Sequence, residues 1–473
     1  MARRASEAAK LFVDFANETG SPYHTVSACA KLLKASGFNE LSDGKPWPLT
    51  RGGRYFVTKG GSEIMAFVVG GKFLQAGAQS GFSIVGAHTD SPCLRLRPNS
   101  KMSSSGMLQV GIQTYGGGLW HTWFDRPLGV AGKVVVHETA PGQAEPSLAE
   151  KLVRIPEPLM ILPNLAIHLQ SAEERAAFKV NNETHLQPVL CSKQFDDAAG
   201  SASSRPEDGI FARHHAALLE VVAARLGCQP SDIVDADLCL MDAQPSCLAG
   251  LYQEFISSPR IDNLLSTWAA IQGLCEFAAS DAAAASEDVC VAVSFDHEEC
   301  GSQSACGAES ATLPGWLEVL MSGLEVPQSE RAGLFARSFL VSADCAHGLH
   351  PNYAAKHQSE HRPDFHKGIV IKSNANQRYA TTAITAALFR EVCKQAAVPV
   401  QDFVVRNDSP CGSTIGPILS TKLGIRTIDV GAPQWAMHSC RETCATSDAG
   451  HLLTLCRGFF QSFRKIDSAA RQL

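Results

Sequence analysis

Histidines and carboxylates recur just after apolar runs in this sequence. The runs are residues 82–86, 289–295, 339–341 and 425–430. The polar side chains that follow them are His88 and Asp90, then Glu298 and Glu299, then Asp344 and His347, and finally His438. If the runs are strands of an open α/β sheet, their carboxyl ends form the edge where ligands bind. Imidazole and carboxylate groups without cysteine are typical ligands of zinc or a similar divalent ion.

A further candidate, Asp262, stands at the amino end of a predicted helix. Converging acid and imidazole side chains suit a two-metal site in which one carboxylate bridges the ions. A nearby carboxylate that binds no metal would serve as general base, and the adjacent Glu298 and Glu299 could divide these roles. Asp90 shares a face with His88 on an extended backbone and could orient its ring. A helix cap at Asp262 and a solvated loop at the glutamate pair remain open alternatives, because spacing alone does not show that these residues meet.

The surrounding pattern predicts the elements that position these side chains. From about residue 249 onward, short apolar strands alternate with helical stretches, which favours parallel strands covered by helices. Residues 93–247 look β-rich, with short apolar runs at 107–112, 133–137 and 165–169 between glycines and prolines. We expect an α/β fold with a mixed, largely parallel sheet flanked by helices. Residues 1–92 and 248–473 would form one discontinuous catalytic domain, and 93–247 an inserted β-rich domain.

Composition excludes several classes of protein. The chain has 473 residues, 45% of them hydrophobic, which rules out intrinsic disorder. Its 41 Lys and Arg against 47 Asp and Glu give a net charge of −6, so no nucleic-acid partner is expected. No apolar run approaches the ~18 residues that span a bilayer, so no membrane partner is expected either. The 16 cysteines are dispersed without a C-x-x-C pair, which favours reduced thiols and a cytoplasmic location.

Read together, the segments that carry these residues resemble the M18 family of metallopeptidases, the aspartyl aminopeptidases. The matching segments are residues 86–92, 114–120, 123–128, 164–169, 258–263, 295–302, 342–347, 406–416 and 437–442. They occur in the family's order along nearly the whole chain, so the resemblance is specific. It implies a fold of the zinc-exopeptidase type. It also implies removal of an unblocked amino-terminal Asp or Glu from peptides.

The resemblance also implies roles for individual residues. The chain would bind two divalent metal ions, most readily zinc, with manganese or cobalt as alternatives. One ion would be held by His88, Asp262 and Asp344, and the other by Asp262, Glu299 and His438. Glu298 would be the general base, with Asp90 beside His88 as the other catalytic residue. Asp344, His347, Lys372 and Tyr379 would line the substrate pocket, and His168 would reach the active site of a neighbouring subunit. The family assembles as a tetrahedral dodecamer, with dimer contacts through the inserted domain.

Two other functions remain open at this point. One is a related dinuclear exopeptidase that removes neutral residues. By the resemblance, Lys372, at the end of a predicted strand, would instead supply the local cation that an acidic substrate needs in a protein of net charge −6. A surface lysine is the alternative interpretation of this residue. The other is an inactive oligomeric scaffold, which would not need the complete set of candidate ligands. Cys300 and Cys440 depart from the family's pattern, and neither occupies an expected ligand position.

Overall fold

A nine-stranded sheet lies at the centre of the computed structural model, which describes residues 2–139, 145–199 and 208–470. In spatial order its strands are β1 (Asn39–Glu40), β2 (Arg54–Lys59), β3 (Glu63–Val69), β13 (Val289–Phe295), β4 (Phe82–His88), β14 (Phe339–Ala343), β18 (Arg426–Gly431), β16 (Ile369–Lys372) and β17 (Val400–Phe403). Strand β4 runs parallel to β13 and β14, and β14 runs parallel to β18. Strands β3 and β16 pair antiparallel with β13 and β18. The predicted mixed, largely parallel sheet is confirmed.

Helices cover both faces of this sheet because side chains alternate along each strand. On β3, Ala66 and Val68 pack toward one set of helices, whereas Met65 and Phe67 pack toward the other. The first set is α1 (Ala2–Glu18), α2 (Pro22–Ala35), α7 (Ile261–Ala278), α8 (Asp281–Ala285), α11 (Ala383–Gln395) and α13 (Thr446–Ala470). The second set is α9 (Thr312–Gly323), α10 (Gln328–Arg337) and α12 (Ile415–Leu423). The apolar side chains of the strands are therefore buried on both faces.

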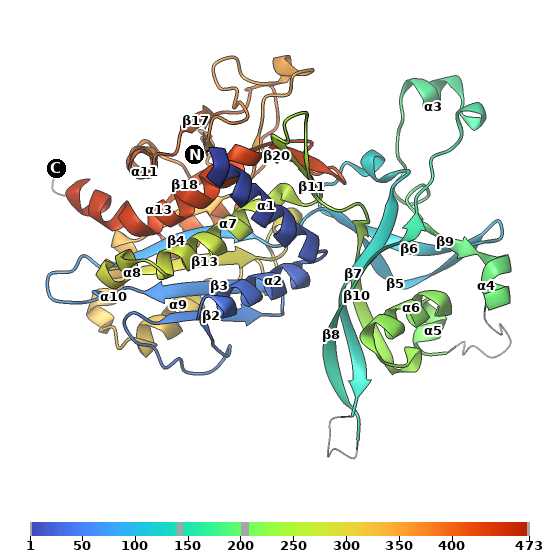
Figure 1. Cartoon of the computed structure of the whole chain (residues 1–473), viewed down its shortest axis with the longest axis horizontal. Coiled ribbons are helices and arrows are strands. Elements are labelled where there is room, and N and C mark those ends of the chain that lie inside the picture. The colour runs from blue at the N-terminus through green and yellow to red at the C-terminus, as the bar shows by residue number, and fades with distance from the viewer. Residues whose placement is uncertain (1, 140–144, 200–207, 471–473) are drawn as a thin grey trace.

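A closed barrel stands beside the α/β part (Figure 1). Its strands, in order around the barrel, are β10 (Ile233–Asp242), β5 (Cys93–Ser104), β6 (Met107–Tyr115), β9 (Val189–Ser192), β8 (Ser147–Ile161) and β7 (Pro127–Glu138). Helices α5 (Ile210–Arg213) and α6 (Ala216–Leu226) pack against its core. The prediction of β-structure at 165–169 is wrong. This run lies outside the barrel, has no strand partner, and forms a single 3₁₀ turn at Ile167–Leu169.

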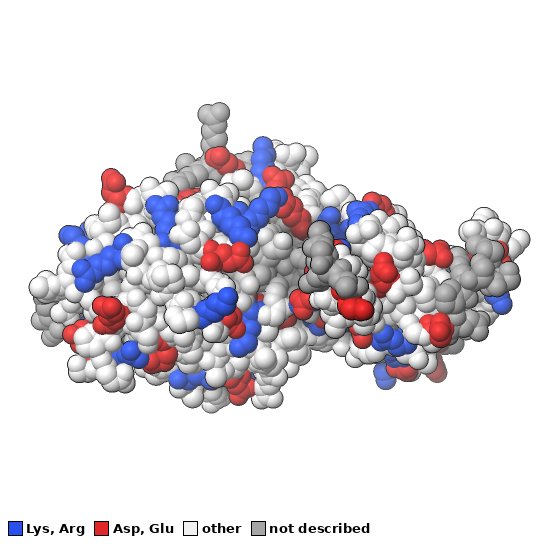
Figure 2. All heavy atoms as spheres, turned by 90° about the horizontal axis from the view of Figure 1, so that it is seen from below, with Lys and Arg blue, Asp and Glu red and all other residues white. Residues whose placement is uncertain are grey.

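A second, five-stranded sheet lies next to the carboxyl ends of the central strands. It consists of β11 (Cys247–Ala249), β12 (Phe255–Ser258), β20 (Glu442–Ala445), β19 (Pro433–Trp435) and β15 (Ala346–His347). The remaining elements are helices α3 (Ala172–Ala176) and α4 (Lys193–Ala199) and 3₁₀ turns at Trp120–Trp123, Pro230–Asp232, Glu298–Cys300 and Ala354–Lys356. Among the described residues, no helix is both long and apolar enough to cross a membrane. Acidic and basic side chains are intermixed on the face shown in Figure 2.

Candidate metal centre

The candidate ligands meet at the carboxyl ends of adjacent parallel strands. His88 is the last residue of β4, and it pairs in register with Phe295 at the end of β13. Glu298 and Glu299 follow in the 3₁₀ turn after β13, and Asp344 comes directly after β14. Two further candidate ligands come from outside the central sheet. Asp262 is the second residue of α7, and His438 lies between β19 and β20.

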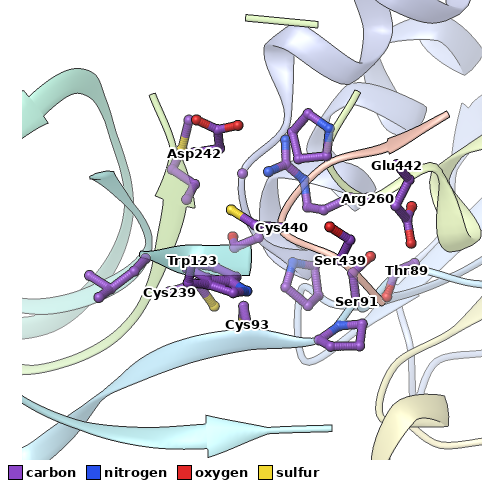
Figure 3. A pocket seen from close by; sticks show the side chains of 17 residues that line it. Thr89, Ser91, Cys93, Trp123, Cys239, Asp242, Arg260, Ser439, Cys440 and Glu442 are labelled. Atoms are coloured by element: carbon purple, nitrogen blue, oxygen red, sulfur yellow. The ribbon is translucent and has the colours of Figure 1, made fainter. Parts of the chain in front are cut away.

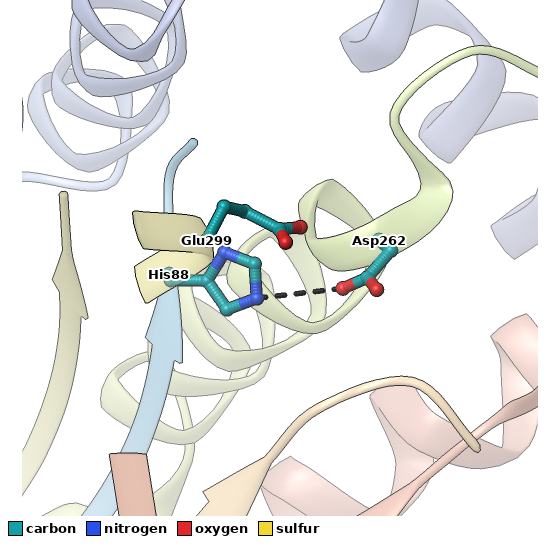
Figure 4. Close-up of side chains that lie close together, drawn as sticks. All are labelled: His88, Asp262 and Glu299. Atoms are coloured by element: carbon teal, nitrogen blue, oxygen red, sulfur yellow. Dashed lines mark ion pairs between the residues drawn. The ribbon is translucent and has the colours of Figure 1, made fainter. Parts of the chain in front are cut away.

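The side chains form one cluster centred on the Asp262 carboxylate. His88 Nε2 lies 3.4 Å from Asp262 Oδ1 and 3.6 Å from Asp344 Oδ1. On the other side, His438 Nε2 lies 3.5 Å from Asp262 Oδ2 and 3.2 Å from Glu299 Oε2. One ligand atom each from His88, Asp262 and Glu299 lies within 4.8 Å of the other two. Figure 4 shows the His88 ring directed at Asp262, with the Glu299 carboxylate beside it.

The donor set fits a metal because buried carboxylate oxygens in it have no partner. Asp262 Oδ1, Glu299 Oε1 and Asp344 Oδ1 are buried and accept no hydrogen bond. Leaving buried charged oxygens unsatisfied is costly, and coordination to a cation removes that cost. These atoms come from three separate chain segments and face two imidazoles, which is the oxygen and nitrogen chemistry that zinc accepts.

Both histidines are held in the orientation expected of metal ligands. His88 Nδ1 donates to the backbone oxygen of Asp90 at 3.1 Å, and His438 Nδ1 donates to the backbone oxygen of Gly117 at 3.0 Å. A hydrogen bond at Nδ1 fixes the tautomer and leaves the Nε2 lone pair for a cation. In both rings Nε2 is the atom directed at the carboxylate cluster.

The ionisation of the cluster reflects burial and close like charges. Burial raises the pKa of Glu298 to about 8. His88 acts in the opposite direction, whereas the carboxylates of Asp344, Asp90 and Asp262 reinforce the rise. Burial and Asp262 likewise raise the pKa of Glu299 well above its ordinary value. Burial works against protonation of His438, but its hydrogen bond to Asp262 prevails and raises the pKa to about 9. A divalent ion would supply the positive charge that this group of buried carboxylates needs, and its binding would release protons from them.

Asp90 organises the loop that carries the glutamate pair. Its carboxylate accepts the backbone N–H groups of Glu298 at 3.2 Å and Glu299 at 3.1 Å. It also accepts the Tyr115 hydroxyl at 2.6 Å and lies 3.3 Å from His88 Nδ1. Tyr115, at the end of barrel strand β6, is covered by the Arg95 guanidinium 3.6 Å from its ring centre. Sequence reasoning missed Tyr115, although it lies inside the segment 114–120 that carries the family resemblance.

Glu442 is a second residue that sequence reasoning missed. Its two carboxylate oxygens accept the backbone N–H groups of Asp262 at 2.9 Å and His438 at 2.8 Å. Burial is the main cause that raises its pKa to about 8. It occupies the start of β20, four residues after His438, and lies inside the segment 437–442 that carries the family resemblance.

The residues expected at the substrate lie together beside the cluster, with one exception. Lys372 is 2% exposed, and its Nζ lies 3.7 Å from Asp344 Oδ2 and 5.2 Å from the centre of the Tyr379 ring. His347 is close by, edge-on to Phe403. His168 is the exception. It is exposed in the segment that projects from the barrel, and within the described chain it makes no hydrogen bond or ion pair to the cluster.

A small cavity lies behind the cluster, at the seam between the barrel and the α/β part (Figure 3). It is lined by Thr89, Ser91, Trp123, Arg260 and Cys440 among others, and its volume is about 30 Å³. This volume suffices for a water molecule but not for a peptide.

A buried histidine–carboxylate cluster at the strand ends of an α/β sheet fits a metal-dependent enzyme. The family described as "Aminopeptidase I zinc metalloprotease (M18)" matches residues 15–460, so the chain belongs to the M18 family. The resemblance found in the sequence is thereby confirmed, and the chain is a metalloaminopeptidase that uses a divalent metal.

Relatives and solved structures agree along the whole length. The chain is 45% identical over 490 residues to the probable aspartyl aminopeptidase of Ricinus communis, covering 99% of both chains. It is 46% identical over 462 residues to the aspartyl aminopeptidase of Caenorhabditis elegans, covering 96% of this chain and 95% of the relative. The cryo-EM structure of the Ape4 and Nbr1 complex contains a chain with a TM-score of 0.93 and 41% identity, covering 98% of this chain and 87% of that one. The mApe1 dodecamer of S. cerevisiae has a TM-score of 0.85 and 27% identity, covering 99% of both chains.

Proposed function

We propose that the chain is a dinuclear aminopeptidase that hydrolyses an unblocked Asp or Glu from the amino terminus of peptides. The observation that carries the dinuclear part is the position of Asp262. One of its oxygens faces His88 and the other faces His438. A carboxylate shared between two imidazoles in this way would bridge two ions if both were bound, which supports the proposal.

The residues divide into two ligand sets around that bridge. His88, Asp262 and Asp344 would hold one ion, and Asp262, Glu299 and His438 the other. Zinc is the first choice from the family, and the same ligands accept manganese or cobalt. When bound, the ions polarise the scissile carbonyl and acidify water. Asp90 and Glu442 keep the ligands in place through the hydrogen bonds described above.

Glu298 is the proposed general base. Its Oε2 lies 3.9 Å from His88 Nε2, at the edge of the cluster, and its side chain is 15% exposed. The carboxylate takes a proton from the attacking water and passes it to the nitrogen of the departing peptide, as one group can do in both steps. The backbone N–H groups of Glu298 and Glu299 both donate to Asp90, and these hydrogen bonds fix the turn. In this turn Glu298 would act as the base while Glu299 binds metal.

Lys372 supports the acidic specificity. Its ammonium group is buried next to Asp344. Burial disfavours the charged form of the lysine, but Asp344 and Tyr379 favour it and raise the pKa above its ordinary value. A substrate side-chain carboxylate beside Lys372 and Tyr379 would meet positive charge and a hydroxyl group within a cluster that is otherwise acidic. The names of the curated relatives point to the same specificity.

We also propose that the enzyme is a homo-oligomer, a tetrahedral dodecamer, in which the barrel part makes dimer contacts and His168 serves a neighbouring subunit. The projecting segment exposes several large apolar side chains, namely Leu165, Ile167, Leu169 and Phe178. Exposed apolar groups gathered on one segment are typical of interfaces. A similar protein, mApe1, is a dodecamer.

The deciding experiment measures release of the first residue from matched peptides that begin with Asp, Glu, Leu or N-acetyl-Asp. We expect release of Asp and Glu that stops on acetylation or chelation and returns with metal. Preference for Leu would support the neutral dinuclear exopeptidase and overturn the Lys372 assignment. Bound metal without release from any peptide would support the scaffold.

A further inference from the structure

Two adjoining cavities open beside the cluster on the side of His347. The first has a volume of about 240 Å³ and the second about 550 Å³. Both are lined by Gln358, Arg406 and the two valines 404 and 405, so they share a wall. We call the pair the basic groove. Its cationic lining residues are Lys356, Arg378 and Arg406, and three histidines, His347, His350 and His357, line the first cavity.

The groove differs from the rest of the chain in its charge. The whole protein has a net charge of −6, yet none of the residues that line either cavity is Asp or Glu. Lys356 is exposed, and in the described part of the chain it forms no ion pair. A surface concavity of one sign raises the local concentration of the opposite charge.

Arg406 is paired with Asp408, which offsets its charge, so Lys356 and Arg378 carry the positive charge of the groove. Its Nε and Nη2 donate to Asp408 at 2.8 and 2.6 Å, and its Nη1 donates to the backbone oxygen of Ala355 at 3.2 Å. Asp408 does not line either cavity. The contact with Ala355 ties Arg406 to the turn that carries Lys356, so the two cations belong to one wall of the groove.

The groove begins where a substrate would leave the metal centre. Met437, which precedes His438, and His347, at the end of β15, both line the first cavity. Phe403 and Trp435 supply apolar walls in the same cavity. A peptide whose first residue lies at the cluster and beside Lys372 must direct its remaining residues away from both. The first cavity offers that path, and the second continues it.

From this arrangement we propose that the basic groove binds carboxylate groups of the departing part of the peptide, beyond the scissile bond. This inference rests on the aminopeptidase activity proposed above and adds a second acidic preference to it. The carboxylate has two possible sources. It is either an Asp or Glu side chain of the second to fourth residue, or the carboxyl terminus of a short peptide.

The test compares tetrapeptides that share the same first residue, Asp, followed by Ala-Ala-Ala, Ala-Glu-Ala or Ala-Lys-Ala. Each is made as the free acid and as the carboxyl-terminal amide. We expect kcat/KM to be about twofold to fivefold higher for Glu than for Ala at the third position, the range of an exposed ion pair. A similar ratio of free acid to amide would identify the carboxyl terminus as the bound group. Ratios near one in both comparisons would overturn the proposal.

The variant Lys356→Glu links the effect to the groove. It should abolish the preference for Glu and favour the peptide with Lys, whereas Lys367→Glu is a matched control. Lys367 is an exposed lysine in the same stretch of chain, and it does not line either cavity. Aspartyl p-nitroanilide has no departing carboxylate, so its rate measures the effect of each charge reversal on the first-residue site, and the peptide ratios of each variant are read relative to that rate. An unchanged preference in Lys356→Glu would refute the assignment.

Failure of the proposed function is distinguishable from failure of the groove. If wild-type enzyme cleaves leucyl but not aspartyl p-nitroanilide, the specificity at Lys372 is wrong, and the same ratios are measured on leucyl tetrapeptides. If neither is cleaved, binding of fluorescent Ala-Glu-Ala and Ala-Lys-Ala to the metal-loaded protein replaces turnover. Tighter binding of the acidic peptide, lost in Lys356→Glu, supports the groove, and equal binding overturns it.

Discussion

Removal of the Tyr115 hydroxyl tests whether the barrel helps to build the metal centre. Tyr115→Phe deletes the 2.6 Å hydrogen bond to Asp90 Oδ2 and leaves the ring under Arg95. A hydrogen bond to a charged acceptor contributes about 1.5–3 kcal/mol. We take the lower value, about 1.5 kcal/mol, because the same Asp90 oxygen keeps the N–H of Glu299 at 3.1 Å.

That free energy corresponds to a roughly tenfold change in a binding constant or a rate, since ~1.4 kcal/mol is a factor of ten. Asp90 contacts the His88 ring and the backbone of Glu298 and Glu299, so the loss should fall on metal affinity and on kcat. Groups that orient metal ligands typically affect affinity or activity by about 10–100-fold. Competition with a chelator of known affinity measures the first quantity, and initial rates at saturating metal measure the second.

Tyr23→Phe is the matched control. Its hydroxyl donates to the carboxylate of Asp237 on β10, so this variant also loses a tyrosine–carboxylate bond between the barrel and the α/β part. It should lower the free energy of unfolding without changing metal affinity. If Tyr115→Phe behaves like Tyr23→Phe, with stability reduced but metal affinity and kcat at the wild-type level, then Asp90 does not depend on Tyr115 and the reasoning is refuted.

Further predictions concern single residues and the metal. Glu298→Gln should retain its metal but lose a factor on the order of 10²–10⁴ in kcat, and a near-wild-type rate would exclude it as the base. Lys372→Met should lower kcat/KM for aspartyl peptides more than for leucyl peptides, and an equal loss would contradict its role in specificity. Neither carboxylate oxygen of Glu63 has a hydrogen-bond partner, and burial raises its pKa to about 9 from an ordinary 4.5. The folded state therefore keeps a proton that the unfolded chain loses, so the free energy of unfolding falls as pH rises from about 4.5 through 9. Urea titrations should show a weaker fall over this range for Glu63→Gln, and equal slopes would contradict it. Chelation should lower the unfolding temperature until metal is returned, because the ion binds the folded state; an unchanged temperature would argue against a buried site.

The sequence predicts those parts of the site that depend on local pattern. Apolar runs of strand length predict β4 and β13. The positions of His88 and of the glutamate pair at the ends of these strands follow from that prediction. Whether the strands are neighbours is a matter of sheet order, which no local pattern contains. Barrel closure is non-local for the same reason, since β5 and β10 pair across more than a hundred residues.

The missed residues share one physical property, which is contact across long stretches of chain. Glu442 binds the backbone of Asp262 180 residues away, and a buried glutamate at a strand start has no local signature. Tyr115 reads as an ordinary aromatic residue at the end of an apolar strand. Their roles follow from hydrogen bonds to backbone and carboxylate groups, and such bonds are visible after the chain has folded.

These contacts make the barrel part of the metal centre rather than an attachment to it. Tyr115, at the end of β6, donates to Asp90, and Gly117, two residues later, accepts the Nδ1–H of His438. One short segment thus orients groups on both sides of Asp262. Displacement of the barrel would loosen a ligand on each side, and bound metal would hold the barrel against the sheet. Metal binding and the contact between the barrel and the α/β part should therefore stabilise each other, because a ligand stabilises the arrangement that it binds.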